Sequence, residues 1–178
     1  MSPAGTSLAG APPAGTVTSE RIETPIGPLW LVTEGEVLLV AGFAVDLAGV
    51  ARALGTPPVR ARARETPSAA ATAATAFFAG DLGALDAVVV RQPGTARMQE
   101  VWRTLRAVPA GTTTTYGALL PAAPRLAARA CAANLVSLFV PCHRVQRADG
   151  SLGGFTWGLE AKTWLRDFES GRAEAAPA

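Results

Sequence analysis

The apolar positions of the first half of the chain predict short strands followed by helices. Three runs at residues 21–23, 29–33 and 37–43 are rich in β-branched and large apolar side chains, as strands are. The break between the last two, Glu34-Gly35-Glu36, has the length of a hairpin turn. Apolar spacing further predicts helices over residues 44–54 and 67–78, the second ended by Gly80, and a short strand over residues 87–90. We therefore expect a small α/β domain over residues 20–93.

The second half changes to helical spacing after Gln92-Pro93-Gly94-Thr95, a sequence typical of a domain boundary. A helix is predicted over residues 96–108. Two short helices, over residues 116–120 and 124–133, follow in the arrangement of a helix-turn-helix. Residues 135–140 form a strand-like apolar run, and residues 159–168 predict a closing helix. The inward face of that helix is expected to carry Leu159, Trp164, Leu165 and Phe168.

These elements predict an α+β fold with two domains. The N-terminal α/β domain is followed over residues 94–170 by a helical domain with a winged-helix-like helix-turn-helix. The 49% hydrophobic content is typical of a globular protein, and no apolar run approaches the roughly 18 residues of a membrane span. Residues 1–19 and 171–178 are expected to be a disordered leader and a tail, and the leader lacks the basic start of a secretory signal.

Charge is distributed unevenly along the chain. Residues 1–94 contain six arginines and eight acids, whereas residues 95–178 contain ten basic residues and six acids. An excess of +4 in the second half suits a polyanion such as DNA, although such an imbalance also occurs without any partner. Two cysteines and no secretory signal indicate free thiols in a reducing compartment, so we expect the protein in the cytoplasm. If the Arg- and Ala-rich composition reflects the genome, the source is a bacterium with a GC-rich genome. Two cysteines and one histidine fall short of a structural zinc site, so we expect neither metal nor cofactor.

The chemistry is expected at Cys142, within Val140-Pro141-Cys142-His143-Arg144-Val145. A cysteine at the end of an apolar run is by default a small buried hydrophobe. Here, however, the only histidine of the chain follows directly, and a basic group can raise the population of the nucleophilic thiolate. Adjacent side chains point apart, so His143 needs a bridging water or a backbone bend to act as base; otherwise it is a structural histidine. Glu169 is the best acid to orient it, although a glutamate near a helix end is usually exposed.

The segment resembles a known family through several motifs with matching spacing. Pro-Cys-His-Arg-Val is followed by Asp149-Gly150, Gly153-Gly154-Phe155, Gly158-Leu159-Glu160 and Lys162. This pattern, from about residue 94 to 169, is similar to the O6-alkylguanine-DNA alkyltransferases, also called methylated-DNA–protein-cysteine methyltransferases. Residues 24–28, Thr-Pro-Ile-Gly-Pro, resemble the start of the family's N-terminal domain.

The resemblance implies direct repair of DNA by a monomer that uses no cofactor and acts once. The alkylated guanine leaves the duplex, and its O6-alkyl group, mainly methyl, moves to Cys142. The resemblance assigns catalytic roles to Cys142 as acceptor, His143 as base, Glu169 as its orienter, Tyr116 as proton donor to guanine, and Asn134 as a brace. It implies DNA contacts, in the minor groove of double-stranded DNA, at Thr115, Arg125, Ala128 and Arg129, and a base pocket at Val145, Phe155, Thr156 and Trp157.

Three positions depart from the family pattern. The interval from Tyr116 to Cys142 is about five residues shorter than the usual family spacing, so two arginines compete for the position that fills the gap in the base stack. Counting back from Cys142 selects Arg125, whereas the local sequence at residues 127–130 selects Arg129. We favour Arg125. Phe155 stands where tyrosine is common. Trp157 stands where glycine is common, and it either narrows the pocket in favour of methyl groups or lies on the surface.

Three other functions fit the sequence less well. A protein that binds alkylated DNA and recruits other repair needs no acceptor, and Cys142 argues against it. A helix-turn-helix transcription regulator would need an effector or zinc module, for which the sequence shows no sign. A cysteine hydrolase would need an oxyanion hole, which also has no separate signal.

Overall fold

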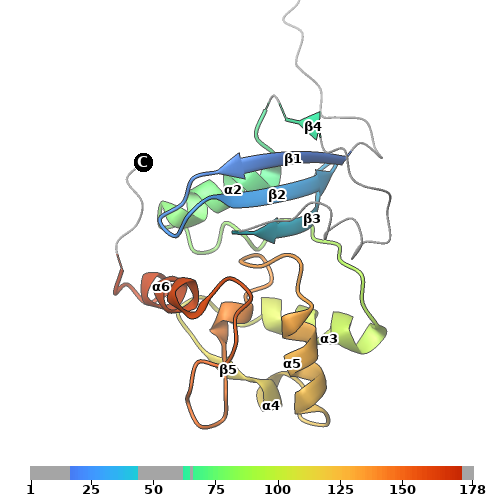
Figure 1. Cartoon of the computed structure of the whole chain (residues 1–178), viewed down its shortest axis with the longest axis vertical. Helices are drawn as coiled ribbons and strands as arrows, with labels where there is room; N and C mark the ends of the chain where they lie inside the picture. Colours follow the sequence, from blue (N-terminus) through green and yellow to red (C-terminus); the bar gives the residue numbers. More distant parts are fainter. Residues whose placement is uncertain (1–16, 44–61, 65, 174–178) are drawn as a thin grey trace, which may run out of the picture.

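A four-stranded sheet forms one end of the protein (Figure 1). This computed structural model describes residues 17–43, 62–64 and 66–173. Strands β1 (Val17–Ile22), β2 (Leu29–Glu34) and β3 (Val37–Gly42) are antiparallel, and β4 (Arg62–Ala63) pairs with β1 in parallel. Gly35, at φ 59°, allows the two-residue turn between β2 and β3. The strands predicted over residues 21–23, 29–33 and 37–43 are confirmed, but β1 begins at Val17, so residues 17–19 belong to the sheet and not to the predicted leader.

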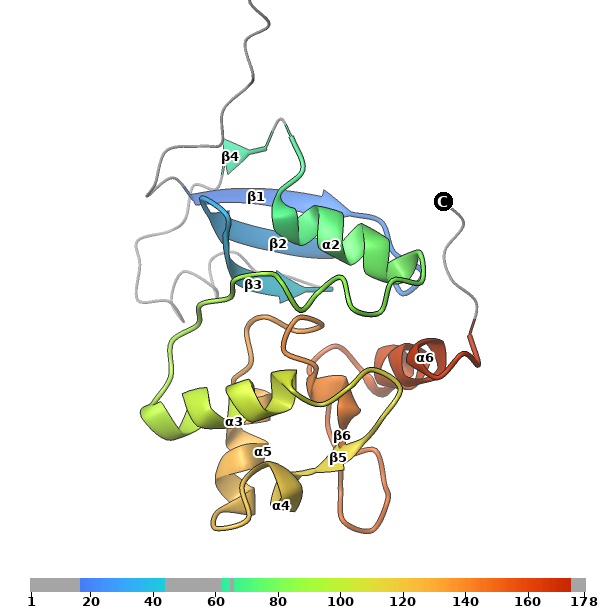
Figure 2. The ribbon, with the colours of Figure 1, turned by 180° about the vertical axis from the view of Figure 1, so that it is seen from behind.

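Helix α2 (Ala69–Phe78) covers one face of this sheet (Figure 2). The Ser68 hydroxyl caps it by accepting a hydrogen bond from the Ala71 amide at 3.0 Å, and Phe77 is fully buried. The predicted helix over residues 67–78 is thus confirmed, with Ser68 as its cap. The predicted helix over residues 44–54 lies outside the described residues. The predicted strand over residues 87–90 is wrong, since only Val90 forms an isolated bridge, to Leu38.

The free edge of β3 is covered by two segments distant in sequence. Leu38 of β3 exchanges backbone hydrogen bonds of 2.9 Å with Val89 and Arg91. Further along, the Ala41 amide donates to the carbonyl of Leu135 at 2.8 Å, and the Ser137 amide donates to the carbonyl of Ala41 at 3.1 Å. The edge strand is therefore satisfied by the chain itself, and the segment before Cys142 is fixed to the sheet.

The rest of the chain is mainly helical and lies beside the β3 edge (Figures 1 and 2). It contains α3 (Ala96–Arg106), α4 (Tyr116–Leu119), α5 (Pro124–Ala132) and α6 (Leu159–Glu169), which confirms the four predicted helices. The short strands β5 (Thr114–Thr115) and β6 (Val145–Gln146) pair in parallel. The indole of Trp102 donates to the carbonyl of Ala130 at 2.8 Å and joins α3 to α5. Leu159 was expected to face inward but is 51% exposed, because it is the first residue of α6.

The strand predicted over residues 135–140 is wrong. Only Val136 forms an isolated bridge, Leu138 has φ 76°, and the Val140 amide donates back to the carbonyl of Val136 at 2.9 Å. The cause is Asn134, whose side chain accepts from the Val136 amide at 3.1 Å and donates to the Val140 carbonyl at 2.8 Å. These local bonds satisfy backbone groups that a strand would pair with a neighbour. The apolar run is consequently a buried turn rather than a strand.

The larger of two hydrophobic clusters among the described residues joins the sheet to the helices. It includes Leu31 and Phe77 in the sheet end, Leu105 in α3, Val136 in the turn and Leu165 in α6. The helices of the described ranges are all too short or too polar to cross a membrane.

Candidate active site

Cys142 begins a single turn of 3-10 helix, η1 (Cys142–Arg144), directly after the buried turn. Pro141 precedes it with φ −81° and ψ 65°, which ends the turn and starts the helix. The Cys142 side chain is nearly buried, with 6% of the residue exposed. It nevertheless borders a cavity of about 330 Å³, so a small group that enters the cavity can meet the sulfur.

The cavity is formed by four separate parts of the chain. Tyr116 comes from α4, Ala128 and Cys131 from α5, Cys142 from η1, and Gly154 and Phe155 from the loop before α6. Thr156 and Ala132 complete it. Four residues predicted from the sequence for the site, Tyr116, Cys142, Phe155 and Thr156, all border this cavity.

Asn134 contacts the sulfur directly. Its side-chain amide donates to Cys142 Sγ at 3.3 Å and to the Val140 carbonyl at 2.8 Å. A donor at this position favours the charged thiolate. Asn134, predicted as a brace, thus contacts both the backbone before Cys142 and the sulfur.

His143 points away from the cavity into a buried ionic cluster. Its Nε2 lies 2.8 Å from Glu169 Oε1, and Arg144 donates to the same carboxylate through Nε at 3.0 Å and Nη2 at 2.7 Å. The Gly111 amide adds a fourth bond at 3.2 Å. Glu169 was a weak prediction because helix-end glutamates are usually exposed, yet this one is only 6% exposed. The cluster fixes the ring, and its Nδ1 has no protein partner among the described residues.

Burial and charge set the protonation states of this cluster. Burial lowers the pKa of His143 despite the opposing effect of Glu169, so the imidazole is neutral near pH 7. Burial alone raises the pKa of Glu169, but hydrogen bonds and charges from His143 and Arg144 outweigh it and lower that pKa to about 2. Glu169 is therefore a carboxylate that accepts the Nε2 proton, which leaves the Nδ1 lone pair of His143 free to take a proton.

Opposing influences act on the two groups that face the cavity. Burial raises the pKa of the Cys142 thiol, while hydrogen bonds from Asn134 and Ser137 and the charge of Lys162 act to lower it. The pKa of Tyr116 is raised, mainly by burial and then by the nearby Cys131 and Cys142. Tyr116 therefore keeps its proton at neutral pH and can donate it.

Lys162 and Cys131 were not predicted as site residues. Lys162 of α6 is fully buried, and its ammonium donates to the carbonyls of Leu152 and Gly154, which fixes the loop that lines the cavity. Its signal in the sequence was that it is the only lysine beside fifteen arginines. Cys131 borders the same cavity as Cys142, but burial and the nearby Cys142 raise its pKa to about 12. Cys131 is consequently a thiol, not a competing nucleophile.

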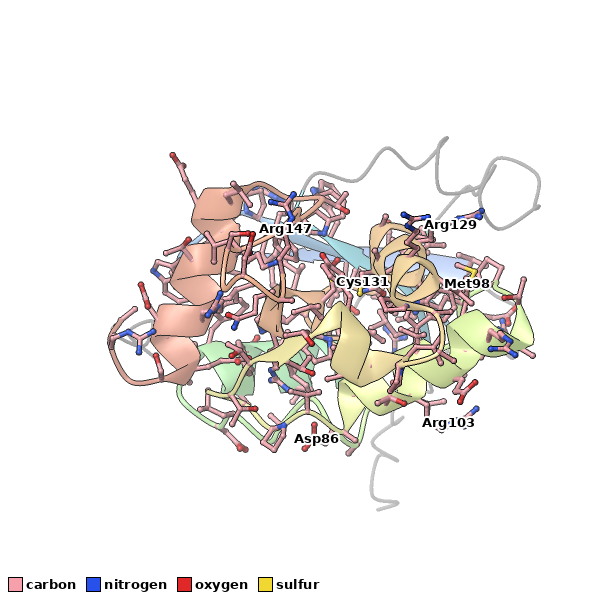
Figure 3. The ribbon with its side chains drawn as sticks, turned by 90° about the horizontal axis from the view of Figure 1, so that it is seen from below. Asp86, Met98, Arg103, Arg129, Cys131 and Arg147 are labelled. Atoms are coloured by element: carbon pink, nitrogen blue, oxygen red, sulfur yellow. The ribbon has the colours of Figure 1, made fainter. Side chains whose placement is uncertain are left out.

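The residues predicted to contact DNA lie on or next to α4 and α5. Arg125 and Arg129 are both exposed on α5, and Figure 3 shows Arg129 at the outer edge of this helix while Cys131 faces the middle of the molecule. Ala128 lines the cavity. Thr115 caps α4, because its hydroxyl accepts from the Ala118 amide at 3.1 Å.

One pocket prediction needs correction. Trp157 does not line the cavity and so does not narrow it: its partly buried indole donates to Ser137 Oγ at 2.7 Å and lies against Gly42 of β3. Glycine at position 42 leaves the space, since a Cβ there would come within 2.2 Å of the ring. Val145 is fully buried in β6 beside Thr114; it was predicted to contact the base through its backbone, and that contact stays a prediction.

A larger hollow, of about 750 Å³, lies between β1 and α2. It is bordered by Glu20, Arg21 and Arg64 among mostly small side chains, and it contains no cysteine or histidine. Size therefore does not identify the site; the position of the nucleophile does. Within the described ranges, no group of three His, Cys, Asp or Glu residues is placed to hold a metal ion.

Comparison with known proteins agrees with this geometry. Residues 96–171 match the family model described as the 6-O-methylguanine DNA methyltransferase, DNA binding domain. Over 156 residues the chain is 35% identical to the methylated-DNA–protein-cysteine methyltransferase of Salmonella typhimurium, covering 82% of this chain and 91% of that protein. The chain belongs to the methylated-DNA–protein-cysteine methyltransferase family.

Relatives from a second genus lead to the same family. The methylated-DNA–protein-cysteine methyltransferase of Mycobacterium tuberculosis is 35% identical over 159 residues, covering 86% of this chain and 93% of that protein. A crystal structure of Mycobacterium tuberculosis OGT in complex with DNA superposes with a TM-score of 0.71 at 30% identity, covering 88% of this chain and 95% of that one. The methyltransferase fold thus extends over most of both chains.

Proposed function

We propose that this methyltransferase repairs DNA by moving an alkyl group, mainly methyl, from O6 of a flipped guanine to Cys142. The observation that supports this most directly is that Cys142 Sγ borders a cavity while Asn134 donates to it and a neutral His143, oriented by Glu169, follows it. The related proteins are named for this transfer, and one of them is described in complex with DNA.

The transfer follows from the protonation states of the site. The Cys142 proton passes through a water molecule to Nδ1 of His143, and the thiolate attacks the alkyl carbon. An S–C bond forms as the C–O6 bond breaks, and the electron pair of the broken bond stays with guanine. Tyr116 donates its hydroxyl proton to the departing base and regains a proton from solvent as His143 releases one. The product is a thioether that water does not cleave, so each molecule acts once and needs no cofactor.

DNA binding is assigned to the helical half. In this proposal residues 20–93 and 94–170 are two domains, and α4 and α5 form a helix-turn-helix that enters the minor groove of double-stranded DNA, with the protein acting as a monomer. The four net positive charges of residues 95–178 favour this half as the face toward the phosphates.

We assign the residue that fills the gap in the stack to Arg125. It lies three residues before Ala128 and seven before Ala132, so all three share one face of α5, and both alanines line the cavity. Arg129 lies four residues after Arg125 and three before Ala132, so it shares this face of α5 and the face alone does not separate the two arginines. We favour Arg125 because it takes this position when residues are counted back from Cys142 without a gap.

The decisive experiment is a mass measurement after incubation with a duplex that contains O6-methylguanine. We expect the peptide with Cys142 to gain one methyl group, and the variant Cys142→Ser to gain none. An unmodified protein that still binds the lesion would overturn transfer in favour of a binding-only role. For the arginine, Arg125→Ala should slow transfer more than Arg129→Ala, and the reverse order would refute the assignment.

A further inference from the structure

The segment that joins the sheet to α3 sends one buried side chain to the active site. Gln92 is 6% exposed, and its amide lies between the backbone of Leu135 and the side chain of Asn134. Its Oε1 accepts from the Leu135 amide at 2.8 Å, and its Nε2 donates to Asn134 Oδ1 at 3.2 Å. The side chain therefore connects a part of the chain outside the cavity to the residue that contacts the sulfur.

The backbone determines which way each amide in this row points. The Leu135 amide is a donor, so only the oxygen of Gln92 can face it, and the Nε2 of Gln92 must then face Asn134. Asn134 Oδ1 accepts from Gln92 and from the Val136 amide, which leaves its Nδ2 for Cys142 Sγ. Reversing Asn134 would set donor against donor at Gln92 and Val136, and would present an oxygen to the sulfur.

We propose that Gln92 is a positioning residue for alkyl transfer: it holds the amide of Asn134 so that the NH2 group, not the oxygen, faces Cys142 Sγ. The proposal rests on the role of Cys142 as acceptor. It adds a residue that touches neither base nor sulfur and acts through Asn134 alone. Hydrogen bonds in such a row polarise one another, so the donor that reaches the thiolate is stronger than an isolated amide.

Two substitutions separate orientation from bulk. In Gln92→Met the side chain keeps its approximate size but loses both bonds, so only Val136 and Val140 still hold the Asn134 amide and it is held less firmly. In Gln92→Glu the shape and the bond from Leu135 remain, but an acceptor replaces the donor toward Asn134 and opposes the present orientation of its amide. Gln99→Leu is the matched control, because Gln99 Nε2 donates only to the backbone carbonyl of Gln92, at 2.8 Å. It removes a bond from the same segment without altering the row of amides.

The first readout uses no DNA. The rate at which methyl iodide methylates Cys142 is followed against pH by peptide mass, since this rate reports the thiolate population. The other titratable groups that act on this sulfur are Tyr116 from α4, Cys131 from α5 and Lys162 from α6, and the substitutions leave them unchanged. We expect Gln92→Met to move the profile to higher pH, Gln92→Glu to move it further, and Gln99→Leu to leave it in place.

The second readout is the transfer rate at saturating O6-methylguanine duplex. A hydrogen bond to a charged group predicts a loss of roughly ten- to hundredfold in Gln92→Met. In an Asn134→Ala background, Gln92→Met should add no further shift to either readout, because its effect passes through Asn134. An unshifted methyl iodide profile in Gln92→Glu, or an equal shift in Gln99→Leu, overturns the proposal. If the native protein reacts with methyl iodide but takes no methyl from DNA, the proposed function fails instead, while the profile still tests Gln92.

Discussion

Replacing Glu169 by glutamine tests the buried cluster behind Cys142. The change keeps the shape of the side chain but removes the charge that Arg144 and His143 share. A glutamate pKa that falls from 4.5 to about 2 on folding corresponds to about 3 kcal/mol. Arg144 is 5% exposed and is left with an uncompensated charge, for which the typical cost is about 3 to 5 kcal/mol. We therefore expect Glu169→Gln to lose about 3 to 5 kcal/mol of unfolding free energy.

The same substitution has an expected effect on rate. A glutamine presents its NH2 group to at least one of the donors that now face the carboxylate, so the ring of His143 is no longer held with Nδ1 as the free base. Loss of a positioned base predicts a transfer rate lower by about 10²- to 10⁴-fold at saturating duplex. Binding of the lesion should change much less, because Glu169 is buried away from the exposed arginines of α5.

Glu160→Gln provides the matched control. It makes the same chemical change on the same helix, but at an exposed position in the first turn of α6. Because a favourable charge at a helix N-terminus is lost, Glu160→Gln should lower the free energy of unfolding by about 0.3 to 1 kcal/mol. The rate of alkyl transfer should not change. Urea unfolding and single-turnover transfer measure the two quantities. If Glu169→Gln were no less stable than Glu160→Gln and reacted at the native rate, the inferred coupling of Arg144, Glu169 and His143 would be wrong.

Three further predictions concern other contacts of the site. The pKa values of His143 and Glu169 are both lowered on folding, so the unfolded chain binds more protons than the folded protein at acidic pH. Urea unfolding should therefore give a free energy of unfolding that is flat just above pH 6.5, falls below pH 6.5 as the unfolded histidine becomes charged, and falls again from pH 4.5 toward 2. A free energy of unfolding that rises on acidification would contradict this. Gly42→Ala should lower the free energy of unfolding by about 1 to 3 kcal/mol, because the added Cβ would overlap the ring of Trp157. In a Trp157→Ala background this loss should disappear, and a loss that persists there would show another cause. Tyr116→Phe should slow transfer at saturating duplex by roughly ten- to hundredfold without weakening duplex binding, as measured by single turnover and titration, and an unchanged rate would remove Tyr116 as proton donor.

Local sequence was sufficient for the parts of the protein that depend on near neighbours. The helices around residues 96–106 and 124–132 follow from apolar spacing and from Pro124 at a helix start. The Pro-Cys-His-Arg motif located the nucleophile, because Cys142 and His143 are adjacent and their chemical types are rare in this chain. Periodicity failed at residues 135–140, where an apolar run reads as a strand but the side chain of Asn134 satisfies the backbone of a turn.

Only the tertiary structure decided how distant side chains meet. Gln92 carries no pattern that marks it, and Lys162 is marked only as the single lysine of a family motif; their contacts exist because the segment before α3 and α6 pack beside the loops of the site. Trp157 could be read from the sequence as narrowing the pocket or lying at the surface, and instead it lies against a glycine of β3, 115 positions earlier. The sequence by itself determined which atom can accept an alkyl group, because that depends on the thiol and its neighbours in the chain. The protonation states of the thiol and its partners depend on burial, on hydrogen bonds from Asn134 and Ser137 and on charges from η1 and α6, which come together only in the folded protein.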